Sequence, residues 1–255
     1  MTWWHGLIIL VAGIWAGTIN AVVGSGTLVT FPVLIALGYS PLTATTSNAI
    51  GLAPGTISGA IGYRHELTGH WPQVIRYSVA SLFGAICGTI LLLNLPTGAF
   101  ETIVPALVGL AVVLVIVQPK VSSWVTKRRE ANGTEHHGGP LLVFFIFLIS
   151  IYGGYFTAAQ GVMLVAVMGM MLSEPLQRLN GMKNVLTAVV NVVAGTIYAF
   201  IAPVSWPVVA VLAVGSTIGG QVGAKLGRRL SPAVLRGVIV VVGVSAMMQL
   251  VVKQV

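Results

Sequence analysis

Long apolar runs alternate with short polar breaks along almost the whole chain. The apolar segments cover residues 4–23, 26–38, 41–62, 72–95, 98–118, 139–160, 161–172, 175–202, 206–226 and 232–252. Most of them supply the ~20 consecutive apolar residues that a helix needs to cross the hydrocarbon core of a bilayer. The pattern therefore predicts an all-α polytopic membrane protein with roughly eight to ten transmembrane or half-membrane helices.

Two of these segments, 26–38 and 161–172, are too short to span a bilayer alone. Each follows a longer apolar run after a break that contains glycine, Gly24-Ser25-Gly26 in one place and Gln160-Gly161 in the other. We interpret each pair as a helical hairpin or a broken helix whose bend lies within the membrane. Non-helical backbone at that depth is tolerated only where protein or water satisfies its polar groups.

The composition supports a membrane protein and leaves no room for a separate soluble domain. Hydrophobic residues make up 56% of the chain and charged residues 7%, against about 25% charged residues in soluble domains. The net charge of +8 comes from basic residues between apolar runs, as in proteins that use positive loops to fix their orientation. We therefore expect a lipid bilayer, and no nucleic acid, as the partner of this positive charge.

The two halves of the chain resemble each other in sequence. Trp71-Pro72 aligns with Trp206-Pro207, and in the same register Ser81, Gly84 and Gly88 align with Ser216, Gly219 and Gly223. Shared membrane composition would instead give scattered Leu, Val and Ala matches. We predict a first transmembrane repeat at 1–118, a polar cytoplasmic linker at 119–138 and a second repeat at 139–255, forming one integral membrane domain.

The basic residues predict that the two repeats have opposite orientations. Arg64 and Arg76 lie near one end of the first repeat, whereas the corresponding loop at 201–206 carries no charge. Five segments in each repeat satisfy every loop, with only Lys253 violating the rule, if the cytoplasmic basic residues are Arg64, Arg76, the cluster at 120–129, Arg178, Lys183 and those at 225–229. An odd number of segments makes the repeats inverted, and inverted repeats with interrupted helices are typical of secondary transporters.

Polar residues inside the apolar segments gather at the breaks and at the starts of the helices that follow. The candidate substrate-binding residues are Asn20, Gly24, Ser25, Gly26, Thr27, Ser47, Asn48, Gln160, Lys183 and Asn184. Helix N-termini carry partial positive charge, hydroxyls and amides bind oxygen atoms, and Lys183 adds a full positive charge. The set favours a small oxyanion, while the absence of Asp from the sequence gives a cation site less support.

Several of these residues also have purely structural interpretations, which the sequence leaves open. The small residues at 24–26 would equally allow close helix contact, and we assign Gly84, Gly88 and their counterparts mainly to packing. Lys183 is either a ligand or a side chain that snorkels to the membrane surface. No motif for an enzyme, a metal site, a cofactor or an ATP-binding loop occurs, so we expect no enzymatic activity, cofactor or bound metal.

Four stretches resemble the sulfite exporter TauE/SafE family of membrane transporters. They are Ala-Gly-Thr-Ile-Asn-Ala-Val-Val-Gly-Ser-Gly-Thr-Leu-Val-Thr-Phe-Pro at 16–32, Ala-Thr-Thr-Ser-Asn-Ala-Ile-Gly at 44–51, Gly-Tyr-Arg at 62–64 and Lys183-Asn184. The resemblance covers essentially the whole chain and implies an inner-membrane, multi-pass exporter of sulfite or of an organosulfonate such as sulfoacetate. Phe156 and Gln160 depart from a strict repeat, which predicts an asymmetric site.

The sequence thus favours a secondary transporter that exports a small sulfur-containing anion by alternating access. The alternatives are a channel or permease for another small solute or a metal ion, and a membrane subunit that transports nothing. Whether a proton or sodium is the coupling ion, and whether the chain forms a homodimer, stays open at this point.

Overall fold

The computed structural model describes residues 2–132, 138–226, 237 and 241. These residues form the α-helices α1 (Trp3–Val22), α2 (Thr27–Ala36), α3 (Pro41–Gly62), α4 (Trp71–Asn94), α5 (Thr97–Asn132), α6 (Pro140–Tyr155), α7 (Gln160–Met171), α8 (Leu176–Ile201) and α9 (Trp206–Leu226), with a short 3-10 helix at Arg64–Leu67. The apolar segment expected at 232–252 lies almost wholly outside the described residues.

Five of the described helices are long and apolar enough to cross a membrane. They are α1, α4, α8, the part of α5 at Gly98–Lys120, and α9 up to Lys225. Many of their large apolar side chains face outward, including Phe83, Val113 and Phe200. An exterior of this kind suits lipid rather than water, and the prediction of an all-α membrane protein is confirmed.

The two short segments form helices that are too short to cross a bilayer. At 1.5 Å per residue, α2 is ~15 Å long and α7 is ~18 Å long, against a hydrocarbon core of ~30 Å. Each helix follows a non-helical break, at 23–26 and 156–159 respectively. The helix α5 extends further than the sequence indicated, because it continues to Asn132 through much of the region expected to be a polar linker.

Glycines allow two pairs of helices to pack at very short distance. A Cβ atom at Gly84 or Gly88 of α4 would lie 2.5 or 1.9 Å from the carbonyl oxygens of Phe147 and Ile151 in α6. At Gly219 of α9, it would lie 2.0 Å from the carbonyl oxygen of Ile14 in α1. The packing role that the sequence indicated for these glycines agrees with the structure: α4 pairs with α6 and α9 pairs with α1.

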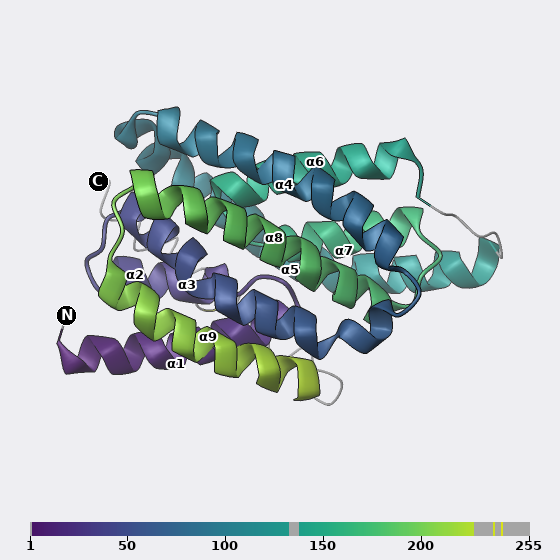
Figure 1. The fold of residues 1–255 in the computed structure, drawn as a ribbon, viewed down its shortest axis with the longest axis horizontal. Helices are drawn as coiled ribbons and strands as arrows, with labels where there is room; N and C mark the ends of the chain where they lie inside the picture. The colour runs from purple at the N-terminus through teal and green to yellow at the C-terminus, as the bar shows by residue number, and fades with distance from the viewer. Residues whose placement is uncertain (1, 133–137, 227–236, 238–240, 242–255) are drawn as a thin grey trace.

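The helices α3 and α8 pack against each other with opposite chain directions. Gly59, near the end of α3, approaches Asn184 near the start of α8, whereas Gly195 near the end of α8 approaches Ile50 of α3. Figure 1 shows α8 crossing the middle of the molecule, between α4 and α6 on one side and α3 and α9 on the other. The arrangement places the breaks before α2 and α7 next to the start of α8.

Candidate functional site

The two helix breaks touch each other inside the protein. The backbone N–H of Gly161 donates a hydrogen bond of 3.1 Å to the carbonyl oxygen of Gly24. Gly24 has a φ of 91°, which residues other than glycine rarely adopt. A Cβ atom at Gly24 would also lie 2.6 Å from the Cα of Gly161, so both backbone conformation and space require glycine here.

Lys183 lies beside this contact and is fully buried. Its Nζ donates hydrogen bonds to the carbonyl oxygens of Asn20 (2.9 Å) and Ala21 (3.0 Å), at the end of α1. With an exposed fraction of 0%, the side chain does not snorkel to a surface. Within the described residues no carboxylate forms an ion pair with it. An ammonium has three donors, so one N–H remains for a ligand.

Asparagine side chains hold the end of α1 in place. The Asn20 Oδ1 accepts a hydrogen bond of 3.1 Å from the backbone N–H of Gly26, across the first break. The Asn184 Nδ2 donates to the Ala21 carbonyl oxygen at 3.2 Å. Both predicted residues therefore have structural partners next to the break. Each side chain also has one amide atom that these bonds do not use, the Asn20 Nδ2 and the Asn184 Oδ1.

Hydroxyls and an amide connect α2, α3 and the break before α7. The Oγ1 atoms of Thr27 and Thr157 lie 3.1 Å apart. The Asn48 Nδ2 donates to the Thr27 Oγ1 at 3.1 Å, and the Thr30 hydroxyl donates to the Asn48 Oδ1. Asn48 thus belongs to the same buried polar cluster as Thr27, as the sequence indicated.

Two predicted site residues have buried side chains without a hydrogen-bond partner. The Ser25 Oγ and both amide atoms of Gln160 are inaccessible and unbonded. Such groups cost free energy unless a ligand or water satisfies them. They flank the first turns of α2 and α7, neither of which has a side-chain cap. The contact between Gly24 and Gly161 therefore brings two helix N-termini together, each next to one unused polar side chain.

Ser47 is the predicted residue that has a different role in the structure. Its Oγ accepts a hydrogen bond of 2.9 Å from the backbone N–H of Ser205, in the connection between α8 and α9. The neighbouring Thr46 hydroxyl donates to the Pro203 carbonyl in the same connection. Ser47 thus anchors this loop to the start of α3, while the other predicted residues lie at or beside the two breaks.

Sequence reasoning missed buried polar residues further along α8. The Thr187 Oγ1 and the Asn191 Oδ1 are inaccessible and have no hydrogen-bond partner. They follow Lys183 at intervals of four residues, which places all three on one face of the helix. This four-residue spacing of polar residues was the feature of the sequence that could have predicted them. Across the described residues, no group of three His, Cys, Asp or Glu side chains is placed to hold a metal ion.

Comparison with known proteins adds independent information about this chain. Residues 9–250 match the family model described as sulfite exporter TauE/SafE. The chain is 25% identical over 228 residues to the probable membrane transporter protein YfcA of Escherichia coli strain K12, covering 89% of this chain and 82% of that protein. No solved structure matches the chain significantly.

A second relative gives a similar result. The chain is 20% identical over 215 residues to a probable membrane transporter protein of Haemophilus influenzae, and the match covers 83% of this chain and 81% of the relative. Both relatives are matched over more than four-fifths of their length, so the similarity extends through both repeats expected from the sequence.

Proposed function

The chain belongs to the sulfite exporter TauE/SafE family, and from this membership and its buried polar site we propose that it exports a small sulfur-containing anion, sulfite or an organosulfonate such as sulfoacetate. As a member of this family it is a multi-pass membrane transporter rather than an enzyme. The sulfur-containing substrate comes from the family's description and from the chemistry of the site.

The observation that carries the proposal is the buried Lys183, whose stem lies against Gly24 and Gly161, the chain neighbours of the unpartnered Ser25 and Gln160. Its free N–H, the Gln160 amide and the Ser25 hydroxyl can all donate to oxygen atoms. A buried positive charge without a carboxylate partner is costly, and a bound anion would compensate it. A cation would instead meet Lys183 and two positive helix N-termini, so an anion is the better match.

Alternating access is supported by the directions of the central helices. The helices α3 and α8, which correspond in the two predicted repeats, run antiparallel at the centre of the molecule. We propose that the repeats are inverted and that the contact between Gly24 and Gly161 marks their meeting point near the midplane. In transporters of this design one repeat moves against the other around a fixed central site.

The membrane potential would favour outward movement of an anion. An inside-negative potential contributes about 2.3 kcal/mol per charge per 100 mV. We propose the inner, or cell, membrane as the location because that membrane carries such a potential. A proton or sodium ion as coupling partner, and a homodimeric assembly, are further parts of the proposal that flux and cross-linking measurements would test.

A flux assay in proteoliposomes tests the function. Purified protein should give saturable uptake or release of labelled sulfite or sulfoacetate, inhibited by an excess of the other anion. Imposing a proton or sodium gradient in turn would identify the coupling ion. Current that rises linearly with voltage and never saturates would indicate a channel, saturable flux of a metal ion would indicate a different permease, and no flux of any anion would favour a subunit that transports nothing.

A further inference from the structure

A long apolar groove runs along the outside of the protein, away from the buried polar site. It has a volume of about 600 Å³ and lies between α3, α4 and α8. Valines and an alanine of α8, Val185, Ala188, Val189, Val192 and Val193, contribute to it. Several lining residues, including Ile57, Ile61 and Val192, are 41–48% exposed, so the groove opens to the surroundings.

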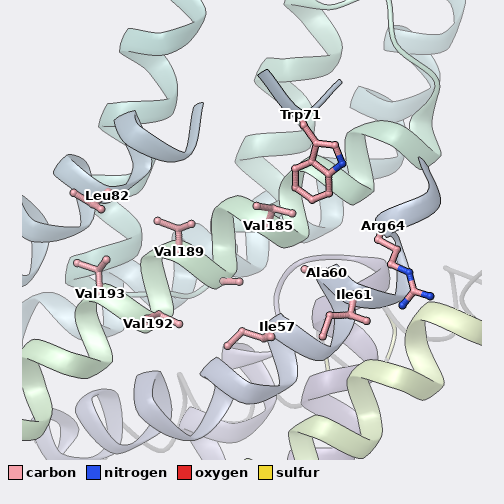
Figure 2. A pocket seen from close by; sticks show the side chains of 11 residues that line it. Ile57, Ala60, Ile61, Arg64, Trp71, Leu82, Val185, Val189, Val192 and Val193 are labelled. Atoms are coloured by element: carbon pink, nitrogen blue, oxygen red, sulfur yellow. The ribbon is translucent and has the colours of Figure 1, made fainter. Parts of the chain in front are cut away.

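One end of the groove carries an arginine and a tryptophan, whereas the rest is lined by aliphatic side chains. Figure 2 shows Arg64 and Trp71 toward one end, and Leu82 and Val193 toward the other. Arg64 follows the last turn of α3, and Trp71 begins α4. Tryptophan and arginine at helix ends are typical of the boundary between hydrocarbon and lipid headgroups. The groove therefore starts at a membrane surface and extends into the apolar core.

Arg64 is unpaired among the carboxylates of the described residues. Nearby, Glu174 pairs with Arg178 and lies 3.6 Å from the His70 Nδ1, whereas Arg64 is exposed and forms no ion pair with any described residue. A free guanidinium that ends an apolar groove is complementary to a molecule with a hydrocarbon chain and an anionic head. Basic pockets between transmembrane helices bind anionic lipid headgroups in this way.

The groove also has the length of a single acyl chain. From Trp71 to Leu82 it follows α4 for ~16 Å. Each leaflet contributes ~15 Å to a hydrocarbon core of ~30 Å. We propose that this groove, defined by the side chains of α3, α4 and α8 that end at Arg64, is a binding site for one anionic glycerophospholipid, with its acyl chain along α8 and its phosphate on Arg64.

A second groove in the same protein provides an internal comparison. The groove between α1 and α9 has a similar volume, about 590 Å³, and is lined by Trp3, Leu7, Leu10 and apolar residues of α9 without any basic side chain. It can accept a hydrocarbon chain but offers no charge to a phosphate. Retention of anionic lipid should therefore depend on a basic side chain at the groove, Arg64 here and Arg76 in the groove between α4 and α6, and not on apolar grooves in general.

Native mass spectrometry of the detergent-purified full chain tests the site, with dioleoyl phosphatidylglycerol and dioleoyl phosphatidylcholine as probes. The wild-type protein should retain phosphatidylglycerol about fivefold better than phosphatidylcholine, the effect expected of one basic residue near the surface. In an Arg76→Gln background, which removes the charge of the groove between α4 and α6, Arg64→Gln should remove this preference. Lys120→Gln, which removes an exposed charge outside the groove, should keep it.

Filling the groove separates chain binding from simple charge attraction. Val192→Phe should reduce retention of both lipids several-fold, whereas Val113→Phe, on an exposed surface of α5, should not. A preference that survives Arg64→Gln in the Arg76→Gln background, or equal retention by the two phenylalanine variants, would overturn the proposal. Spontaneous cross-linking between copies of a Val192→Cys variant, made in a Cys87→Ser background, would also overturn it by showing that a second chain covers the groove.

Discussion

The backbone N–H of Gly161 and the carbonyl oxygen of Gly24 are joined by a hydrogen bond of 3.1 Å that connects two helix breaks from opposite halves of the chain. The stem of Lys183 packs against both glycines, since a Cβ at either one would lie 3.0–3.1 Å from the Lys183 Cδ. Any relative movement of the two halves must therefore change the surroundings of the buried ammonium. This coupling makes Lys183 the first residue to test.

Replacing Lys183 with methionine should strongly weaken anion binding without preventing folding. The variant loses the free N–H and the positive charge, and we expect at least a tenfold loss of affinity, about 1.4 kcal/mol. Removing a buried charge relieves its desolvation cost, which offsets the loss of the two hydrogen bonds to the Asn20 and Ala21 carbonyls. The apparent melting temperature in detergent should therefore stay within a few degrees of the wild type, while sulfite or sulfoacetate binding is measured by titration.

A matched substitution distinguishes this effect from a general change in charge. Lys120→Met removes an exposed lysine at the far end of the predicted α5 span and should leave affinity unchanged. If Lys183→Met binds the anion as tightly as Lys120→Met does, the ammonium is not a ligand. Its hydrogen bonds to the Asn20 and Ala21 carbonyls would then be its whole role.

Gln160→Leu should weaken anion binding while leaving stability unchanged or slightly higher. Both amide atoms of Gln160 are buried without partners, so the leucine side chain loses no hydrogen bond and removes an unsatisfied group. We expect a loss of affinity of about five- to tenfold, corresponding to one hydrogen bond of ~1–1.4 kcal/mol. Thermal unfolding and anion titration of the same preparation separate the two effects.

A suitable control removes a buried hydroxyl whose donor is already used in a hydrogen bond within the protein. The Tyr198 hydroxyl donates to the Gly154 carbonyl oxygen, and Tyr198→Phe should lower stability with little effect on affinity. The opposite result for Gln160→Leu, a loss of stability with normal binding, would remove the glutamine from the site.

The asparagines of α3 and α8 should both contribute to affinity. Asn48→Ala breaks the links from Asn48 to Thr27 and Thr30, and Asn184→Ala breaks the bond to the Ala21 carbonyl. Each substitution should reduce affinity several-fold and leave the protein assembled, as judged by a single symmetrical peak in size-exclusion chromatography. Unchanged affinity in both variants would show that these amides only hold the helices together.

The apolar pattern was sufficient to predict most of the helices. Runs near 20 residues became spanning helices such as α4 and α9, and the short segments after Gly26 and Gln160 became half-length helices. The end of α5 was not predictable from hydropathy, because its last turns carry the basic residues of the expected linker, and lysine and arginine are good helix formers. Polarity alone therefore does not mark a helix end.

Buried polar residues near the breaks were predictable where a polar residue interrupted an apolar segment, and their role in substrate binding stays a prediction. Asn20, Asn48 and Lys183 were identified in this way, since buried polar groups in a membrane need a reason. The partner of Ser47 was not predictable, because adjacent residues on a helix face different directions: Asn48 bonds to Thr27 of α2, whereas Ser47 accepts from the backbone N–H of Ser205. Contacts between helices far apart in sequence, such as that of Lys183 with Asn20, required the three-dimensional arrangement.

Alanine at the tight helix contacts should destabilise the protein without changing its site directly. At Gly88 the added Cβ would overlap the Ile151 carbonyl oxygen of α6, and overpacking of this kind costs about 1–3 kcal/mol. Gly98→Ala is the matched control, because no atom lies within 4 Å of the position its Cβ would take. Equal melting temperatures for the two variants would contradict the close packing of α4 on α6.

Labelling of single cysteines tests the inverted arrangement of the two halves. His65 lies next to the start of α8, where the Arg178 Nε donates to the Glu66 carbonyl oxygen, and Phe200 lies at the other end of this helix, which is ~39 Å long. The cysteine is placed at His65 rather than at Arg64, because the charge of Arg64 is expected to fix the orientation of the chain in the membrane. In a Cys87→Ser background, His65→Cys and Phe200→Cys should react with a membrane-impermeant maleimide from opposite sides of sealed vesicles. Reaction of both from the same side would rule out inverted repeats, and with them the proposed exchange of the central site between the two faces of the membrane.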